Sequence, residues 1–136
     1  MIIQPIKTHV FEEGNDLFTF ITRYFKKVTD KSVIVVTSKI VALSENRTAI
    51  VKNIKTKEKL IRAESQFAIP TKYVWLTIKD GMVMASAGID ESNANGKLIL
   101  LPKDSFKTAH FLRNKLQQKY GVKHLGVLIT DSRTIP

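Results

Sequence analysis

The chain has 136 residues, with 22 Lys and Arg against 12 Asp and Glu, and therefore a net charge of +10. Its length fits one domain, and 43% hydrophobic with 25% charged residues is an ordinary globular composition. The absence of cysteine excludes a disulfide scaffold, thiolate catalysis and cysteine metal ligands. No apolar run approaches the roughly 20 residues that span a bilayer, and the first residues lack the features of a signal peptide. We therefore expect a soluble, cytoplasmic protein without membrane contact.

The first third of the sequence predicts two helices and one strand. Apolar residues at helical spacing predict a helix over residues 17–28, which Asn15 or Asp16 can cap by accepting a hydrogen bond from the first turn. Residues 33–36 form a continuous run of Val and Ile, which is typical of a strand buried on both faces. A short helix over 38–44 is predicted to follow this strand.

The middle of the sequence predicts a polar helix and a hairpin. The helix covers residues 56–65. Residues 73–79 then alternate in polarity, and a second apolar run covers 82–84. Asp80 and Gly81 separate these two runs, and an Asp-Gly pair between strands is a strong signal for a tight hairpin turn.

The last third predicts strand, helix and strand. Residues 87–96 form a loop rich in Gly, Asn, Asp and Ser, and a strand over 98–101 follows it. Asp104 is positioned to cap a helix that ends at Gly121, and a buried strand is predicted over 125–129. Together the elements predict one α/β (α+β) domain over residues 1–136, with a mixed sheet and flanking helices.

Basic residues are spread almost evenly along the sequence, which is more typical of a solvated surface than of a binding patch. The densest run lies between Lys52 and Arg62, and no aromatic residue interrupts it, so a base-stacking surface is not indicated. A basic nucleic-acid-binding domain remains an alternative function. The even charge and the lack of a groove-reading motif count against it.

Two acidic strand ends are the best candidates for chemistry. Asp90 and Asp131 each lie near a hydroxyl residue at the end of an apolar segment. Hard cations such as Mg²⁺ prefer carboxylate and hydroxyl oxygens, so two such strand ends brought together can hold an ion against a nucleotide. The alternative is turn chemistry, since Asp, Asn and Gly are common in loops for conformational reasons alone. We expect the two carboxylates to approach one another in the fold.

The sequence of the loop over residues 87–96, called here the acidic loop, resembles that of a known family. Residues 87–96, AGIDESNANG, followed by LLPKD at 100–104, resemble the signature of the coenzyme F420-0:L-glutamate ligases, also called F420 gamma-glutamyl ligases. Three further segments match in the expected order. They are EGNDL at 13–17, VVTSKIV at 35–41 with SENR at 44–47, and GVLITDS at 126–132.

This resemblance implies a gamma-glutamyl ligase-like fold and a GTP-dependent ligase that uses Mg²⁺ or Mn²⁺. Such an enzyme activates the terminal carboxylate of a deazaflavin coenzyme precursor as an acyl phosphate, which the amine of L-glutamate then attacks. Metal ions neutralise the charge on the phosphoryl oxygens that are transferred. The resemblance also implies a homodimer.

The family pattern assigns roles to residues of this chain. Asp90 and Asp131 are implied as metal ligands, and Ser132 stands where the family usually has a threonine ligand. No catalytic residue is assigned. The implied nucleotide-binding residues are Gln4, Pro5, Ile6, Lys7, Ser38, Lys39 and Asn93.

The sequence departs from the family pattern at several positions. Leu43 stands where many of these ligases carry a nucleotide-contacting lysine, so GTP and another nucleotide both remain open. The segment between Asn53 and Trp75 is shorter than usual, and the later glycine-rich part of the family is absent. We therefore expect the N-terminal part of a longer ligase-like protein, inactive by itself. The alternative is a non-catalytic binding or assembly module that kept the ligase fold.

Overall fold

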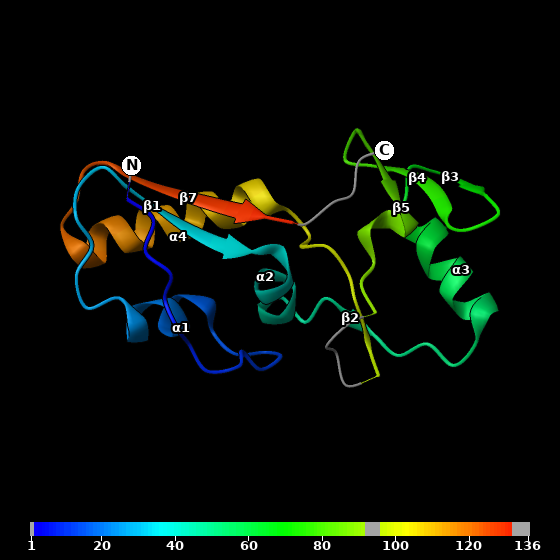
Figure 1. Ribbon diagram of the computed structural model, residues 1–136, viewed down its shortest axis with the longest axis horizontal. Helices are drawn as coiled ribbons and strands as arrows, with labels where there is room; N and C mark the ends of the chain where they lie inside the picture. Colours follow the sequence, from blue (N-terminus) through cyan, green and yellow to red (C-terminus); the bar gives the residue numbers. More distant parts are fainter. Residues whose placement is uncertain (1, 92–95, 132–136) are drawn as a thin grey trace.

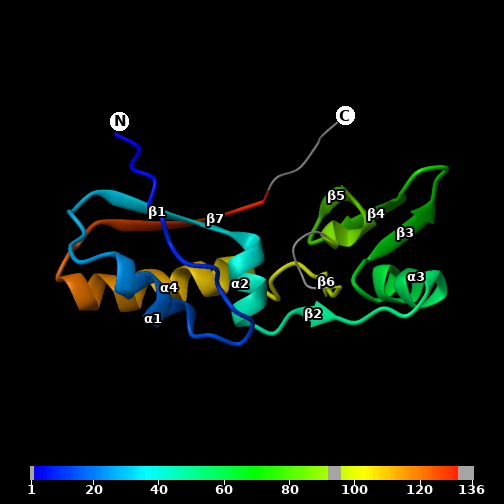
Figure 2. The same cartoon turned by 60° about the horizontal axis from the view of Figure 1, so that its bottom comes forward.

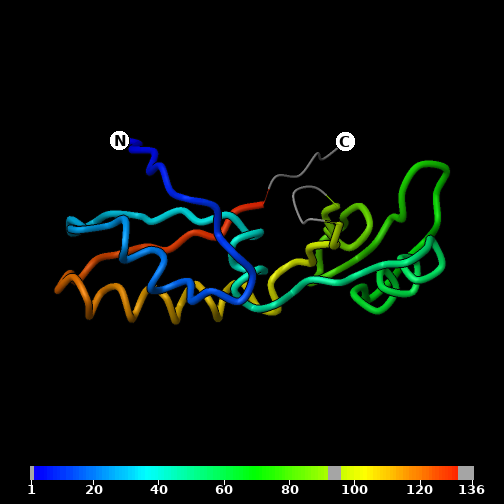
Figure 3. The backbone as a smooth tube through the Cα atoms, turned by 90° about the horizontal axis from the view of Figure 1, so that it is seen from below, coloured from blue at the N-terminus to red at the C-terminus, as the bar shows by residue number. Residues whose placement is uncertain are grey.

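The structure is a computed structural model that describes residues 2–91 and 96–131. It is elongated and has two lobes (Figure 1). One lobe is built around strands β1 and β7 and is called here the parallel lobe. The other is built around strands β3, β4 and β5 and is called the antiparallel lobe. Two segments of chain pass between the lobes, one from α2 to α3 and one from η1 to α4 (Figure 3).

The parallel lobe holds the main hydrophobic core. Strands β1 (Ser32–Thr37) and β7 (Leu125–Thr130) pair in parallel. Helices α1 (Leu17–Tyr24), α2 (Ser38–Ser44) and α4 (Ser105–Tyr120) lie against one face of this pair (Figure 2). Buried side chains from all five elements meet there; they include Ile21, Ile34, Val36, Val41, Leu112, Leu116 and Leu125.

The opposite face of the parallel pair is exposed. Val33, Val35 and Leu128 are 62%, 59% and 51% exposed, whereas Ile34 and Val36 beside them in β1 are buried. The prediction that β1 is buried on both faces is therefore wrong, and β7, which was predicted to be buried, also has an exposed residue on this face, Leu128. The reason is that α1, α2 and α4 all pack on the same side, so only every second strand residue meets the core.

The antiparallel lobe contains the predicted hairpin. Strands β4 (Trp75–Lys79) and β5 (Met82–Ala85) are antiparallel, and Asp80 and Gly81 join them with φ values of 51° and 73°. Positive φ at both central residues is the geometry of a type I′ turn, which matches the twist of the strands it joins. The hairpin prediction is confirmed.

Three further elements complete this lobe: helix α3 (Ile54–Ala63), strand β3 (Phe67–Pro70) and the 3₁₀ turn η1 (Ser86–Gly88). β3 pairs with β4 and was not predicted. Thr77 of β4 is fully buried, and its hydroxyl donates to the carbonyl of Met84 at 2.7 Å and accepts from the amide of Ala87 at 2.8 Å. These bonds fix η1, and hence the start of the acidic loop, to the sheet.

A short ladder and an ionic cluster join the two lobes. Strands β2 (Thr48–Ala49) and β6 (Leu98–Ile99) pair antiparallel between them. Beside this ladder, Glu64 Oε2 binds Arg47 Nη2 at 2.6 Å and Lys79 Nζ at 2.5 Å. Arg47 Nε also donates to the carbonyl of Leu101 at 3.0 Å. The carboxylate of Glu64, at the end of α3, thus binds both Arg47, which follows α2, and Lys79 of strand β4.

The α/β class is confirmed, and three of the predicted helix ends are confirmed, but α1 ends at Tyr24 and not at residue 28 as predicted. Asp16 caps α1, Asp104 caps α4, and Gly121 ends α4. The parallel and antiparallel pairs occupy three separate sheets within the described residues. Within those residues, no helix is both long and apolar enough to cross a membrane.

Candidate functional site

The carboxyl ends of β1 and β7 meet at the first turn of α2. Thr37 and Thr130 are paired at the end of the parallel ladder, so Ser38 and Asp131 follow directly from neighbouring strands. Ser38 is only 6% exposed, and its hydroxyl donates to Asp131 Oδ1 at 2.7 Å. This bond joins residues that are 93 positions apart in the chain. It fixes the orientation of the Asp131 carboxylate.

Asp90 reaches the same turn of α2 from the acidic loop. Its backbone forms a bridge with Ile99, with N–O distances of 2.9 and 2.8 Å. Its Oδ2 atom lies 2.6 Å from Lys39 Nζ. Ser38 and Lys39 are consecutive, so both aspartates contact the same short segment of α2. The approach of the two carboxylates to one another stays a prediction.

The donor set here suits a hard divalent cation. Carboxylates such as those of Asp90 and Asp131 are oxygen ligands of the kind that Mg²⁺ and Mn²⁺ take in proteins, together with hydroxyl, water and phosphate oxygens. Both Lys39 and Asp90 keep about a third of their side-chain surface exposed, 32% and 39%, so the group is open to a ligand. Two of the implied residues, Asn93 and Ser132, lie outside the described residues. Within the described ranges, no group of three or more His, Asp and Glu side chains is placed so that it could hold a metal ion by itself.

The loop that carries Asp90 is held by ion pairs that sequence reasoning did not identify. Lys57 of α3 pairs with Glu91, the residue after Asp90. Lys97, near the end of the same loop, binds Glu13 Oε2 at 2.6 Å. No local sequence signal predicts these pairs, because each joins charges that are 34 or 84 positions apart. Through Glu13, the EGNDL segment is placed beside the acidic loop.

The N-terminal residues Gln4, Pro5, Ile6 and Lys7 lie in an exposed segment without regular secondary structure. This segment is anchored further along, where the amide of His9 donates to Tyr24 Oη at 2.9 Å. Tyr24 packs against Phe20, and the buried Phe11 packs against the Phe20 ring. The nucleotide role of the four residues therefore stays a prediction.

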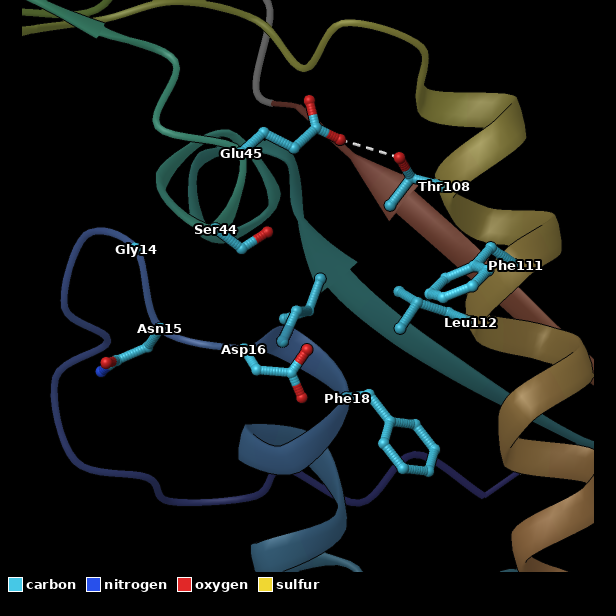
Figure 4. Close-up of a pocket in the computed structure, with 10 residues that line it drawn as sticks. Gly14, Asn15, Asp16, Phe18, Ser44, Glu45, Thr108, Phe111 and Leu112 are labelled. Carbon is cyan, nitrogen blue, oxygen red and sulfur yellow. Dashed lines mark hydrogen bonds between the residues drawn. The ribbon is translucent and has the colours of Figure 1, made fainter.

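A cavity of about 360 Å³ lies at the other end of α2, between α1 and α4 (Figure 4). Its acidic side chains are engaged in bonds that hold the fold. Asp16 caps α1, and Glu45 accepts from Thr108 Oγ1 and from the amide of Lys103, both at 2.8 Å. Leu43, which replaces the expected lysine, packs against the hydrophobic core nearby. This end of α2 therefore has a structural role.

Comparison with known proteins gives the family. A family model described as F420-0:Gamma-glutamyl ligase matches residues 5–136. The chain belongs to this family. The match covers the acidic loop, both ends of the parallel ladder and the α2 turn.

Three curated relatives, each named coenzyme F420:L-glutamate ligase, agree with this family. The protein from Methanopyrus kandleri is 41% identical over 78 residues, which is 57% of this chain and 31% of the relative. The protein from Methanococcus maripaludis strain C7 is 28% identical over 163 aligned positions, covering 100% of this chain and 64% of the relative. The protein from Archaeoglobus fulgidus is 27% identical over 141 positions, covering 90% and 56%. The chain thus spans less than two thirds of each of these gamma-glutamyl ligase relatives.

Proposed function

We propose that this chain is the nucleotide- and metal-binding part of a ligase that joins L-glutamate to the carboxylate of a coenzyme F420 precursor. The observation that carries the proposal is the convergence of Asp131 and Asp90 on Ser38 and Lys39. The family of the chain and the names of its relatives support the substrate class. The reaction is proposed to use GTP and to pass through an acyl phosphate.

In this proposal the chain's own residues position a phosphate-bearing nucleotide. Asp90 and Asp131, with Ser132 beyond the described residues, would hold Mg²⁺ or Mn²⁺, and the ion would neutralise charge on the transferred phosphoryl group. Ser38 keeps the Asp131 carboxylate in one orientation. Lys39 balances the charge of Asp90 and supplies a cation for phosphate oxygens. Asn93 and residues Gln4 to Lys7 are proposed as further nucleotide contacts.

The assembly and its compartment are part of the same proposal. We propose a homodimer acting in the cytoplasm, on the strength of the family resemblance. The exposed apolar faces of β1–β7 and of β3–β4–β5 are consistent with further contacts in the whole enzyme; Phe67 and Val83 of the second face are 54% and 66% exposed.

Asp131→Asn tests the metal role directly. The amide keeps the acceptor for Ser38 but removes the charge, so the metal-free protein should melt at or slightly above the wild-type temperature. Stabilisation by Mn²⁺ should be lost, because only the folded wild type binds the ion. Thermal melts in EDTA and in excess Mn²⁺ measure both effects.

The matched control is Asp80→Asn, which removes the same charge from the exposed hairpin turn, where asparagine also tolerates a positive φ. This variant should keep the full Mn²⁺ shift. The metal assignment is wrong if Asp131→Asn melts lower in EDTA and responds to Mn²⁺ as the wild type does.

A further inference from the structure

A second cavity, of about 400 Å³ and wide open to solvent, lies at the amino ends of β1 and β7. It is therefore at the opposite end of the parallel ladder from Ser38 and Asp131. Its lining is unusually basic: it includes Lys31, Arg113, Lys123 and His124. These residues come from three separate segments of the chain, and none of them was identified as a site by the sequence or by the family pattern.

Hydrogen bonds of the backbone or the side chain hold each basic residue at this cavity. The amide of Lys31, which has a φ of 63°, donates to the carbonyl of His124 at 2.7 Å. The amides of Lys123 and His124 both donate to Asp30 Oδ1, at 3.0 and 2.7 Å. Arg113 Nε donates to the carbonyl of Leu125 at 2.9 Å. These bonds hold the backbones of Lys31, Lys123 and His124 and the guanidinium of Arg113 at the cavity, whereas the lysine side chains are exposed to solvent.

The charges around the cavity are unbalanced. Asp30 is an acidic residue that touches this group, and its Oδ2 atom also lies 2.9 Å from His124 Nδ1. Hydrogen bonds from the backbone and the ring of His124 hold the pKa of Asp30 below its usual value, so this carboxylate stays ionised near neutral pH. Two lysines and an arginine line the cavity beside this one negative charge, and an excess of positive charge favours binding of an anion.

We propose that this cavity binds a phosphate group. Arginine offers a planar fork of N–H donors to phosphate oxygens, and lysines add point charges. Gly126 and Val33 also line the cavity, and the Val33 side chain covers Gly126, where a Cβ atom would lie 3.1 Å from Val33 Cγ2. The site is distinct from the one at α2 and does not depend on the proposed ligase activity.

Titration with inorganic phosphate tests the proposal, using ¹H–¹⁵N NMR of the whole chain at constant ionic strength maintained with chloride. The wild type should show saturable shifts at Lys31, Lys123 and His124. Arg113→Gln and Lys123→Gln should each weaken phosphate binding by about tenfold or more, since each removes a charge-assisted hydrogen bond. Lys123→Gln keeps the backbone bond to Asp30, so it tests the charge even if Arg113→Gln disturbs the fold.

The matched control is Lys107→Gln, which removes an exposed lysine at the other end of α4. It should leave phosphate binding unchanged. Glycerol 3-phosphate in a parallel titration separates the two sources of this chemistry: tighter binding than inorganic phosphate identifies a phosphate ester as the ligand, and equal or weaker binding identifies free phosphate. The proposal is overturned if the wild type shows no saturable shift, or if Lys107→Gln weakens binding as much as Lys123→Gln does.

Discussion

At the scale of single residues, short polar contacts decide how the two lobes and the candidate site are arranged. Ser38 and Lys39 show this most clearly. These adjacent side chains bind the carboxylates of Asp131 and Asp90, which are 41 positions apart in sequence. Strand-end reasoning could predict that Asp131 lies beside the start of α2, because it follows a strand that pairs in parallel with the strand before Ser38. It could not predict the Lys39–Asp90 ion pair, because that contact depends on how the acidic loop folds over β6.

The Glu64 cluster gives a pH-dependent prediction at this scale. Burial raises the pKa of Glu64, but hydrogen bonds from Arg47 and Lys79 outweigh it, and the pKa lies below its ordinary value of 4.5. A carboxylate with a lowered folded-state pKa stabilises the protein above its unfolded pKa. That contribution is lost as the pH falls through the lower, folded-state value.

Glu64→Gln should therefore lower the free energy of unfolding at pH 7 by about 1–3 kcal/mol, because Arg47 and Lys79 lose their shared counter-charge. Below pH 4.5 the difference from wild type should shrink. Denaturant unfolding at pH 7, 5 and 3 measures this, with the exposed Glu12→Gln as control. A gap between Glu64→Gln and wild type that stays constant from pH 7 to pH 3 would contradict the assignment.

At the scale of secondary-structure elements, local chemistry predicted most helices and the hairpin. Asp16, Asp104 and Gly121 mark helix ends because capping needs only a few neighbouring residues. Strand β3 was missed because its four residues neither alternate in polarity nor form a long apolar run. The exposure of Val33 and Val35 could not be predicted, because it depends on which side of the ladder the helices pack.

Gly88, the second residue of the acidic loop, is a glycine that the packing requires. Gly88 has a φ of 69°, and a Cβ atom there would lie 2.7 Å from Leu101 Cδ1. Gly88→Ala therefore combines backbone strain with a clash against a buried side chain. Its free energy of unfolding should fall by about 2–4 kcal/mol.

Gly81→Ala is the matched control, because Gly81 has a φ of 73° and no atom within 4 Å of the position of a Cβ. This variant should lose only about 1 kcal/mol from the strained backbone. Chemical denaturation of the two variants gives the comparison. Equal losses would show that contact with Leu101 does not shape the acidic loop.

At the scale of the whole molecule, the sequence predicted the fold class and the family, while the two-lobed shape came only from the structure. β2, β6 and the Glu64 cluster join the two lobes. No local sequence pattern signals such long-range contacts, so the arrangement of the lobes could not be predicted. The site residues that the resemblance implies fall into three groups. Ser38 contacts Asp131 and Lys39 contacts Asp90, Gln4 to Lys7 lie on an exposed segment, and Asn93 and Ser132 lie outside the described residues.

The central claim is that a divalent ion binds where β1, β7 and the acidic loop meet the first turn of α2. Paramagnetic Mn²⁺ locates such an ion directly, because it broadens the NMR signals of nearby amides. Titration of the ¹⁵N-labelled chain with substoichiometric Mn²⁺ should broaden the signals of Ser38, Lys39 and Asp90 first, and excess Mg²⁺ should restore them. Selective broadening around other carboxylates, such as Glu45 or Asp104, with sharp signals at Ser38 and Lys39, would contradict the account.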